Sequence, residues 1–186
     1  SCYLSVLEKY PNAQVSKALK SVVRIREQES AGRDLYRALK FEEARAVFVE
    51  VGKADSQRRE RMRYFSALCL YGQGRDDEAE AEIRNLAEGS SDETVRKEAV
   101  LWLAKFLYNR REWKESGRLF AESARLQGDS ERAAEAMLWA SRAAFSDGKY
   151  NQAIKLSTDL TERYPSAKVK CGALMVQGES LIELAR

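Results

Sequence analysis

Apolar and small residues recur along this chain in one order, with 37 residues between equivalent positions. Three stretches align without gaps from Tyr64, Leu101 and Leu138, and a fourth begins at Met175. Each of the three aligned stretches holds two runs in which apolar residues fall every three or four positions, as on one face of an amphipathic helix. The pattern therefore predicts a series of two-helix hairpins in phase with one another.

Small residues occupy two fixed places in each predicted hairpin, where two helix backbones can approach closely. In the first helix they are Ala67, Ala104, Ser141 and Gly178, and in the second they are Ala79, Ser116 and Ala153. Gly74 and Gly148 lie between the helices and suit a helix end with a left-handed backbone. Between hairpins, residues 90–93, 128–130 and 164–166 carry the Ser, Asp, Gly and Pro residues that start and stop helices.

The repeat boundaries describe one domain, residues 1–186, which we expect to be a fragment of a longer array. Residues 1–12 are predicted to form the second helix of a preceding repeat, and residues 166–186 the first helix of a final one. The repeats between them are predicted at 13–55, 56–91, 92–128 and 129–165. The first of these opens with a long helix, from about residue 13 to residue 39, because no Gly or Pro interrupts it before Gly32.

The composition supports an all-helical chain and removes several kinds of chemistry. Hydrophobic residues make up 44% and charged residues 33%, with only 2 Pro and 10 Gly among 186 residues. There is no His, which excludes most schemes that use imidazole as a general base or zinc ligand. The sequence also lacks a Gly-rich phosphate loop, a nucleophile elbow and any cluster with metal-ligand spacing. We predict no enzyme activity, no catalytic residues, no metal site and no cofactor.

Neither a membrane segment nor cysteine chemistry is indicated. The longest uninterrupted apolar run is Ala99–Ala104, far below the roughly 20 residues that span a bilayer. No signal peptide or transmembrane segment is predicted. Cys69 and Cys171 are expected to be small packing residues within helices. A lipid-modified Cys2 is disfavoured, because it leads directly into a predicted helix.

The residues that punctuate the repeat resemble those of a known family. The run Gly148–Ala153 reads Gly-Lys-Tyr-Asn-Gln-Ala and follows a first helix that carries a small residue and then an aromatic one. This is similar to the tetratricopeptide repeat, whose usual length is about 34 residues, and the extra residues here fall in the turns between repeats. The resemblance covers nearly the whole chain and implies an all-α, right-handed superhelical solenoid of stacked antiparallel helix hairpins. Such a fold offers an extended surface to a protein or peptide partner and has no enclosed catalytic pocket.

A narrower resemblance comes from the ends of two predicted second helices. Arg163–Ala167 reads Arg-Tyr-Pro-Ser-Ala, and Lys9–Ala13 reads Lys-Tyr-Pro-Asn-Ala. These endings are similar to those of a bacterial envelope group that includes outer-membrane assembly lipoproteins and Tol-associated periplasmic proteins. The resemblance implies a periplasmic or envelope-associated location. A purely structural explanation is also open, since Pro stops a helix and the Tyr ring can pack under the turn.

In the resembled family the first helices line a concave groove, and the repeat phase assigns residues to it. The candidate partner-binding residues are Tyr64, Phe65, Tyr71, Leu101, Trp102, Lys105, Tyr108, Leu138, Trp139, Arg142 and Phe145. Aromatic anchors with a polar rim are typical of peptide-binding surfaces. The alternative is that Trp102 and Trp139 only join neighbouring helices as core residues. A carboxylate clamp of the chaperone-cofactor type is not expected, because only Lys105 and Arg142 are basic at the corresponding positions and each lacks its companion.

Charge is uneven along the chain, although the net charge is only +3. Residues 17–63 hold 13 basic and 8 acidic residues, most densely at Arg58–Arg63. An acidic partner, an anionic membrane surface or RNA would suit this stretch, and so would a solvated helix face of internal ion pairs. RNA binding is the least favoured of these, because RNA-reading repeats need polar base-reading residues at the same position of each repeat and the groove positions here are apolar. The predicted function is a protein-interaction scaffold, and the alternative is a structural spacer or self-association module.

Overall fold

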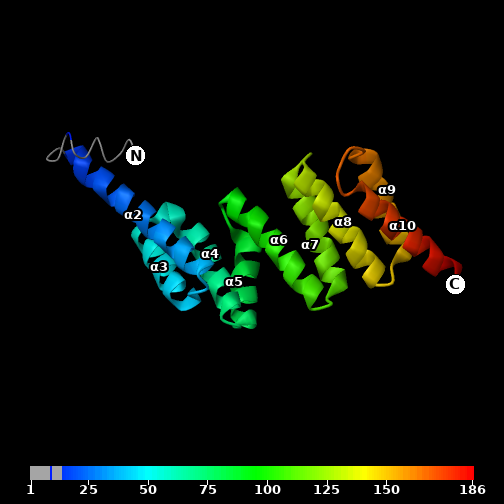
Figure 1. The fold of residues 1–186 in the computed structure, drawn as a ribbon, viewed down its shortest axis with the longest axis horizontal. Coiled ribbons are helices and arrows are strands. Elements are labelled where there is room, and N and C mark those ends of the chain that lie inside the picture. Colours follow the sequence, from blue (N-terminus) through cyan, green and yellow to red (C-terminus); the bar gives the residue numbers. More distant parts are fainter. Residues whose placement is uncertain (1–8, 10–13) are drawn as a thin grey trace. The chain divides into compact units, whose positions relative to one another are not determined.

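The chain folds into helices throughout the part that the structure describes. The computed structural model describes residues 9 and 14–186, with the side-chain surroundings of residue 9 and of residues 19–186. The helices are α2 (Gln14–Arg37), α3 (Phe41–Ala54), η1 (Ser56–Arg58), α4 (Arg59–Gly72), α5 (Asp76–Gly89), α6 (Glu93–Asn109), α7 (Trp113–Gln127), α8 (Glu131–Ser146), α9 (Tyr150–Arg163) and α10 (Lys170–Ala185). Helices α2 to α4, and separately α6 to α10, turn back on one another in order of sequence (Figure 1), so the predicted all-α fold class of stacked helix hairpins is confirmed.

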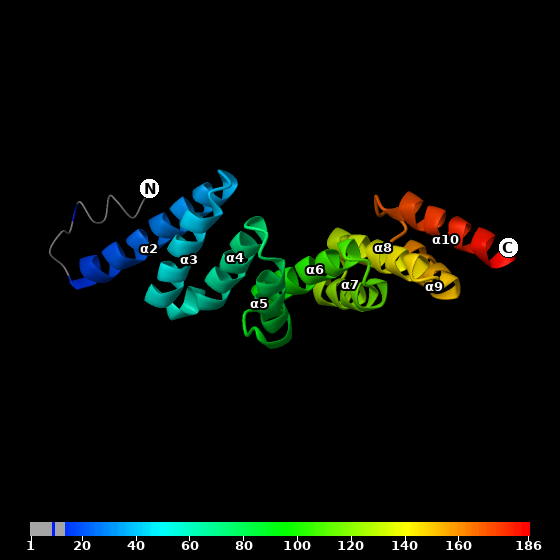
Figure 2. The ribbon, with the colours of Figure 1, turned by 90° about the horizontal axis from the view of Figure 1, so that it is seen from below.

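Two compact units divide the chain, Ser1–Glu82 and Ile83–Arg186. Unit 1 holds α2, α3, η1, α4 and the first half of α5, and α3 packs against both α2 and α4. Unit 2 holds the rest, in which α6 to α10 pack in order of sequence and α10 also contacts α8 (Figures 1 and 2). Cys2 and nearly all of the helix predicted at residues 1–12 lie outside the described residues.

Side chains of two predicted turns cap the helices that follow them. Asp92 precedes α6, and its carboxylate accepts hydrogen bonds from the backbone N–H groups of Thr94 (2.9 Å) and Val95 (3.2 Å). Ser130 precedes α8, and its hydroxyl accepts from the Ala133 N–H at 3.2 Å. Each cap satisfies N–H groups that have no partner inside the helix and contributes about 1 kcal/mol. These caps fix where two of the first helices begin.

Each turn inside a hairpin contains one residue whose positive φ angle gives it a left-handed backbone. Gly74 (φ 74°) and Gly148 (φ 72°) occupy this position, as predicted. The equivalent residue of the intervening repeat is Arg111, whose φ is 63°, and Leu39 has a φ of 60° in the turn after α2. A side chain strains this backbone, because its Cβ comes too close to the following carbonyl oxygen.

Replacing Arg111 by glycine is expected to stabilise unit 2 by roughly 0.5–1 kcal/mol, because the strain of a left-handed arginine disappears. The reverse change, Gly148→Ala, is expected to destabilise unit 2 by about 1 kcal/mol. Urea denaturation followed by tryptophan fluorescence measures both effects, since all 3 Trp residues lie in unit 2. If Arg111→Ala stabilised unit 2 as much as Arg111→Gly, the backbone explanation would be wrong.

The predicted small residues lie where the two helices of a hairpin touch. Ala104 on α6 and Ser116 on α7 are fully buried, and the Ser116 hydroxyl donates to the Ala104 carbonyl oxygen at 2.8 Å. Ala79 and Ala153, at the matching place of the other second helices, are fully buried as well. A larger side chain at these positions would push the two backbones apart. The predicted close approach of α6 and α7 is therefore confirmed.

The end of α9 is tied back to the turn that precedes α8. Arg163 pairs with Asp129 at 2.5 Å, and this bond lowers the pKa of the Asp129 carboxyl. The Tyr164 hydroxyl donates to the Gly128 carbonyl oxygen at 3.3 Å, and its ring centre lies 5.3 Å from the Arg163 guanidinium. The Tyr-Pro ending at residues 164–165 thus has a structural role, because it fastens one repeat turn to the next.

Candidate partner-binding surface

In unit 1 the predicted groove residues lie on α4 and differ in how far they reach solvent. Tyr64 and Phe65 are half-buried, whereas Tyr71 is 44% exposed near the end of the helix. The Phe65 ring stacks on Phe48, a core residue of α3, with the ring centres 5.2 Å apart. Two guanidinium groups also flank the Phe65 ring, at 5.3 Å and 5.9 Å from its centre. Phe65 therefore belongs to the packing of unit 1 as much as to its surface.

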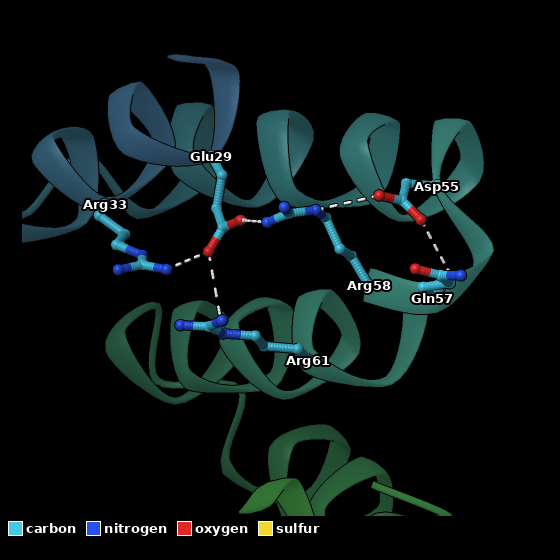
Figure 3. A network of polar contacts seen from close by, with 6 residues as sticks. All are labelled: Glu29, Arg33, Asp55, Gln57, Arg58 and Arg61. Atoms are coloured by element: carbon cyan, nitrogen blue, oxygen red, sulfur yellow. Dashed lines mark hydrogen bonds and ion pairs between the residues drawn. The ribbon is translucent and has the colours of Figure 1, made fainter. Parts of the chain in front are cut away.

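A buried carboxylate organises the basic stretch that the sequence singles out. Glu29, on α2, is only 4% exposed and forms ion pairs with Arg33 and Arg58, while the Arg61 Nε lies 3.8 Å from its Oε1 (Figure 3). Arg58 also donates to Asp55 at 3.0 Å. Arg33 and Arg61 are the two cations that flank Phe65. Much of the basic charge here is therefore used in ion pairs that join α2, η1 and α4.

In unit 2, α6 presents four of the predicted groove residues, Leu101, Trp102, Lys105 and Tyr108. Leu101 and Trp102 are half-buried, and the Trp102 ring stacks on Phe106 with ring centres 5.0 Å apart and an interplanar angle of 13°. Lys105, one turn further along the helix, is exposed and forms no ion pair with any residue that the structure describes. An aromatic ring and an unpaired cation therefore stand next to each other on α6.

Trp139, on α8, joins three helices of unit 2. Its ring stacks on Phe120 of α7 at 6.0 Å and meets Tyr108 of α6 edge-on at 5.2 Å. The Arg142 guanidinium lies 4.9 Å from the centre of the same ring, in cation–π geometry. Trp139 is half-buried, so it helps to pack neighbouring helices and still keeps part of its surface open.

The other two candidates on α8 expose less. Leu138 is 6% exposed and belongs to the core cluster of unit 2, and Phe145 is half-buried against Tyr150, with ring centres 5.5 Å apart. The accessible part of the predicted surface in unit 2 is therefore a set of half-buried rings beside two cations, Lys105 and Arg142.

The two kinds of helix are spaced differently in unit 2. The first helices α8 and α10 contact each other directly. The second helices α7 and α9 line a cavity of about 310 Å³ that reaches Ala140 and Ala144 on α8. A stack of repeats bends toward the side on which neighbouring helices are closest, so the contact between α8 and α10 favours the first-helix side as the inner side of this last part of unit 2.

An exposed apolar face on α10 was missed by the sequence analysis. Its large side chains are Leu174 (49% exposed), Met175 (65%), Leu181 (54%), Ile182 (57%) and Leu184 (47%). The repeat equivalents of Leu181 are Leu70, Leu107 and Ala144, and each of them is at most 6% exposed. The 37-residue period could have revealed this face. It places residues of α10 at positions that, in the earlier repeats, are covered by the second helix of the same hairpin. Cys171 is exposed on the same helix, so the prediction that it is a packing residue is wrong.

The two described cysteines are expected to differ sharply in reactivity. Burial raises the pKa of the Cys69 thiol to about 11, against the opposing effect of the Arg45 charge. In a Cys2→Ser variant at about pH 8, we expect a thiol reagent to modify Cys171 rapidly and Cys69 only when unit 1 opens, since the thiolate is the reactive form. Mass spectrometry over time measures this, and equal rates at the two thiols would contradict it.

Within residues 9 and 14–186, no group of three or more Cys, Asp and Glu side chains is placed to hold a metal ion. No helix among the same residues is both long enough and apolar enough to cross a membrane.

The match to a known family falls on the hairpin of α8 and α9. Residues 135–167 match the tetratricopeptide repeat family. This segment is similar to one tetratricopeptide repeat. The matched segment includes the Gly148–Ala153 run that carries the resemblance in the sequence. The tetratricopeptide repeat (TPR) fold generally mediates interactions between proteins.

Solved structures of similar fold extend the likeness to most of the chain. Two are crystal structures of nearly identical TPR-like repeats from a Podosopora anserina protein named as a kinesin light chain, one of them a single-substitution variant. The variant has a TM-score of 0.61 and 14% identity, and the match covers 84% of both chains. The other has a TM-score of 0.62 and 14% identity over 84% of this chain and 85% of that one. At this identity the likeness concerns the fold. No curated protein matches the sequence.

Proposed function

We propose that this TPR chain is a non-enzymatic scaffold that binds a segment of a partner protein along the first helices of unit 2. The observation that carries the proposal is the set of half-buried rings of Trp102 and Trp139 beside the cations Lys105 and Arg142. Partly open aromatic rings rimmed by charge are common anchors of peptide recognition. The general role of the TPR fold in protein–protein interaction supports the same function.

The charges beside the rings favour a partner segment that contains acidic side chains. Neither Lys105 nor Arg142 pairs with a carboxylate among the described residues. A carboxylate of the partner would form a charge-assisted hydrogen bond with either cation, while a neighbouring apolar side chain covered a tryptophan ring. The spacing of α8 and α10 supports placing this segment on the inner side of unit 2.

A structural spacer or self-association module in a larger bacterial envelope protein is the second candidate. It is favoured by the exposed apolar face of α10, which a further helix or a second copy would cover. The envelope location rests on the resemblance of the Tyr-Pro endings at residues 10–11 and 164–165. RNA binding is less well supported, because the Arg33, Arg58 and Arg61 side chains are engaged with Glu29.

Photocrosslinking from matched positions separates these functions. A photoreactive amino acid at Lys105, on α6, is expected to crosslink a discrete partner protein in bacterial cells. The same residue at Lys155, exposed on the second helix α9, is expected to give no such product. Adding Arg142→Glu to the variant with the photoreactive amino acid at position 105 is expected to reduce the crosslinking yield several-fold, because a charge that repels an acidic partner replaces one that attracts it. Equal products from both positions, or products made only of this chain, would favour the spacer.

A further inference from the structure

A cavity of about 720 Å³ lies in unit 1, between α3, α4 and the first half of α5. It is distinct from the surface of unit 2 considered above. Its floor is apolar, formed by Phe48, Met62 and Leu70, which are at most 4% exposed, together with Gly52 of α3. A pocket with an apolar floor of this size accommodates a large aliphatic side chain.

Two cations beside this floor form no ion pair with a carboxylate among the described residues. Arg45 and Arg59 line the cavity, and neither forms a hydrogen bond or ion pair within the described part of the chain. The Arg45 Nε is buried without any hydrogen-bond partner. Leaving a buried donor of a charged group unsatisfied carries a free-energy cost that a bound anion can reduce.

The acidic residues of the same cavity are already occupied. Glu82 accepts from Arg63 at 2.9 Å, and Glu78 accepts two hydrogen bonds from Arg75, at 2.7 and 2.6 Å. The Arg75 bond, with a further contribution from the Arg45 charge, lowers the pKa of the Glu78 carboxyl, so this carboxylate stays ionised. The cavity therefore has a surplus of positive charge around an apolar floor.

We propose that this cavity binds an acidic peptide segment, with one aliphatic side chain on the floor and adjacent carboxylates paired with Arg45 and Arg59. Guanidinium groups form two parallel hydrogen bonds with a carboxylate, which gives both affinity and orientation. A nucleic acid suits the site less well, because bases stack on open aromatic rings and the ring of Phe48 is completely buried.

The corresponding cavity of unit 2 shows which features are particular to unit 1. Ser66 and Leu70 of the larger cavity are equivalent to Ala140 and Ala144 of the 310 Å³ cavity between α7 and α9. There the cation Lys149 pairs with Asp147 at 2.7 Å, and Arg118 lies within 4 Å of two glutamates. The repeat architecture thus provides a groove in both units, and in unit 1 the groove is larger and leaves two arginines, Arg45 and Arg59, without an ion pair among the described residues.

Isothermal titration calorimetry with three defined peptides tests the proposal. The probe is the acetylated, amidated pentapeptide Glu-Glu-Leu-Glu-Glu, compared with Gln-Gln-Leu-Gln-Gln and with Glu-Glu-Ala-Glu-Glu. We expect the first to bind, and each of the others to bind at least roughly tenfold more weakly, because one lacks the charges and the other lacks the apolar side chain. No binding of the first peptide at millimolar concentrations, or equal binding of all three, would overturn the proposal.

Protein variants locate the binding. Arg45→Gln and Arg59→Gln are each expected to lower the affinity for the Glu-Glu-Leu-Glu-Glu peptide by roughly fivefold to tenfold. Arg24→Gln, an exposed change on α2 with the same loss of charge, is the matched control and is expected to have no effect. Ala81→Trp fills the cavity from an exposed position on α5 and is expected to abolish binding.

The outcomes remain separable from those of the proposed function. An equal loss in Arg24→Gln, or none in Ala81→Trp, would show that the peptide binds elsewhere by charge alone and would overturn the assignment. If a single-stranded RNA bound more tightly than the Glu-Glu-Leu-Glu-Glu peptide, with the same dependence on Arg45 and Arg59, the ligand of this cavity would be a nucleic acid and the peptide proposal would be overturned. The crosslinks from Lys105 in unit 2 are unaffected by either result.

Discussion

Replacing Phe120 by alanine is expected to destabilise unit 2 by about 4 kcal/mol. The Phe120 side chain is completely buried on α7, stacks on Trp139 at 6.0 Å and meets Tyr108 at 6.3 Å. Its removal loses the transfer free energy of the ring and leaves a cavity that the neighbouring rings, held on α6 and α8, cannot close. Urea denaturation followed by tryptophan fluorescence measures the loss.

The matched control is Lys155→Ala, an exposed change on α9 that is expected to alter the stability by less than about 0.5 kcal/mol. A loss below about 1 kcal/mol for Phe120→Ala would mean that α6, α7 and α8 do not share a packed aromatic core. The same packing affects how binding data are interpreted. Because Trp139 rests on Phe120, a Trp139→Ala variant changes folding as well as surface, and Lys105 and Arg142 are the sharper test of partner contact.

The repeat was predictable because its determinants are local and recur in phase. Ala104 and Ser116 are twelve residues apart, and both are small because the backbones of α6 and α7 approach closely there. The hydrogen bond from the Ser116 hydroxyl to the Ala104 carbonyl oxygen is evidence of this approach. The glycines at 74 and 148 were predictable in the same way, since a left-handed backbone favours glycine. Arg111 was not, because its side chain gives no sign of the conformation that its place in the repeat imposes.

The surface was harder to predict than the helices, because exposure depends on which helix covers which. Leu138 and Trp139 are adjacent in sequence, yet one is core and the other is half-open under Arg142. The period assigns both to the first helix and cannot separate them. The role of Glu29 could not be predicted for a different reason. It lies on α2, outside the 37-residue register, and Arg58 is 29 residues away in the chain.

Removing the Glu29 carboxylate is expected to have the largest effect in unit 1. Glu29→Ala leaves Arg33, Arg58 and Arg61 facing one another without their common counter-charge. Breaking a fully buried ion pair costs about 3–5 kcal/mol, and these arginine side chains are 24–47% exposed, so we expect a loss of about 2 kcal/mol. The rate at which a thiol reagent modifies Cys69 under native conditions reports the opening of unit 1 and measures the loss.

The charge can be separated from the shape with Glu29→Gln, which keeps the size of the side chain and one acceptor oxygen. If repulsion among the arginines is the cause, this variant also opens unit 1 more readily, and added salt restores part of its stability by screening the cations. Asp34→Asn, which breaks the exposed pair with Arg37, is the matched control and is expected to change little. A Glu29→Gln variant as stable as the wild type would mean that the carboxylate acts through packing and hydrogen bonds, and that its charge does not hold α2 to α4.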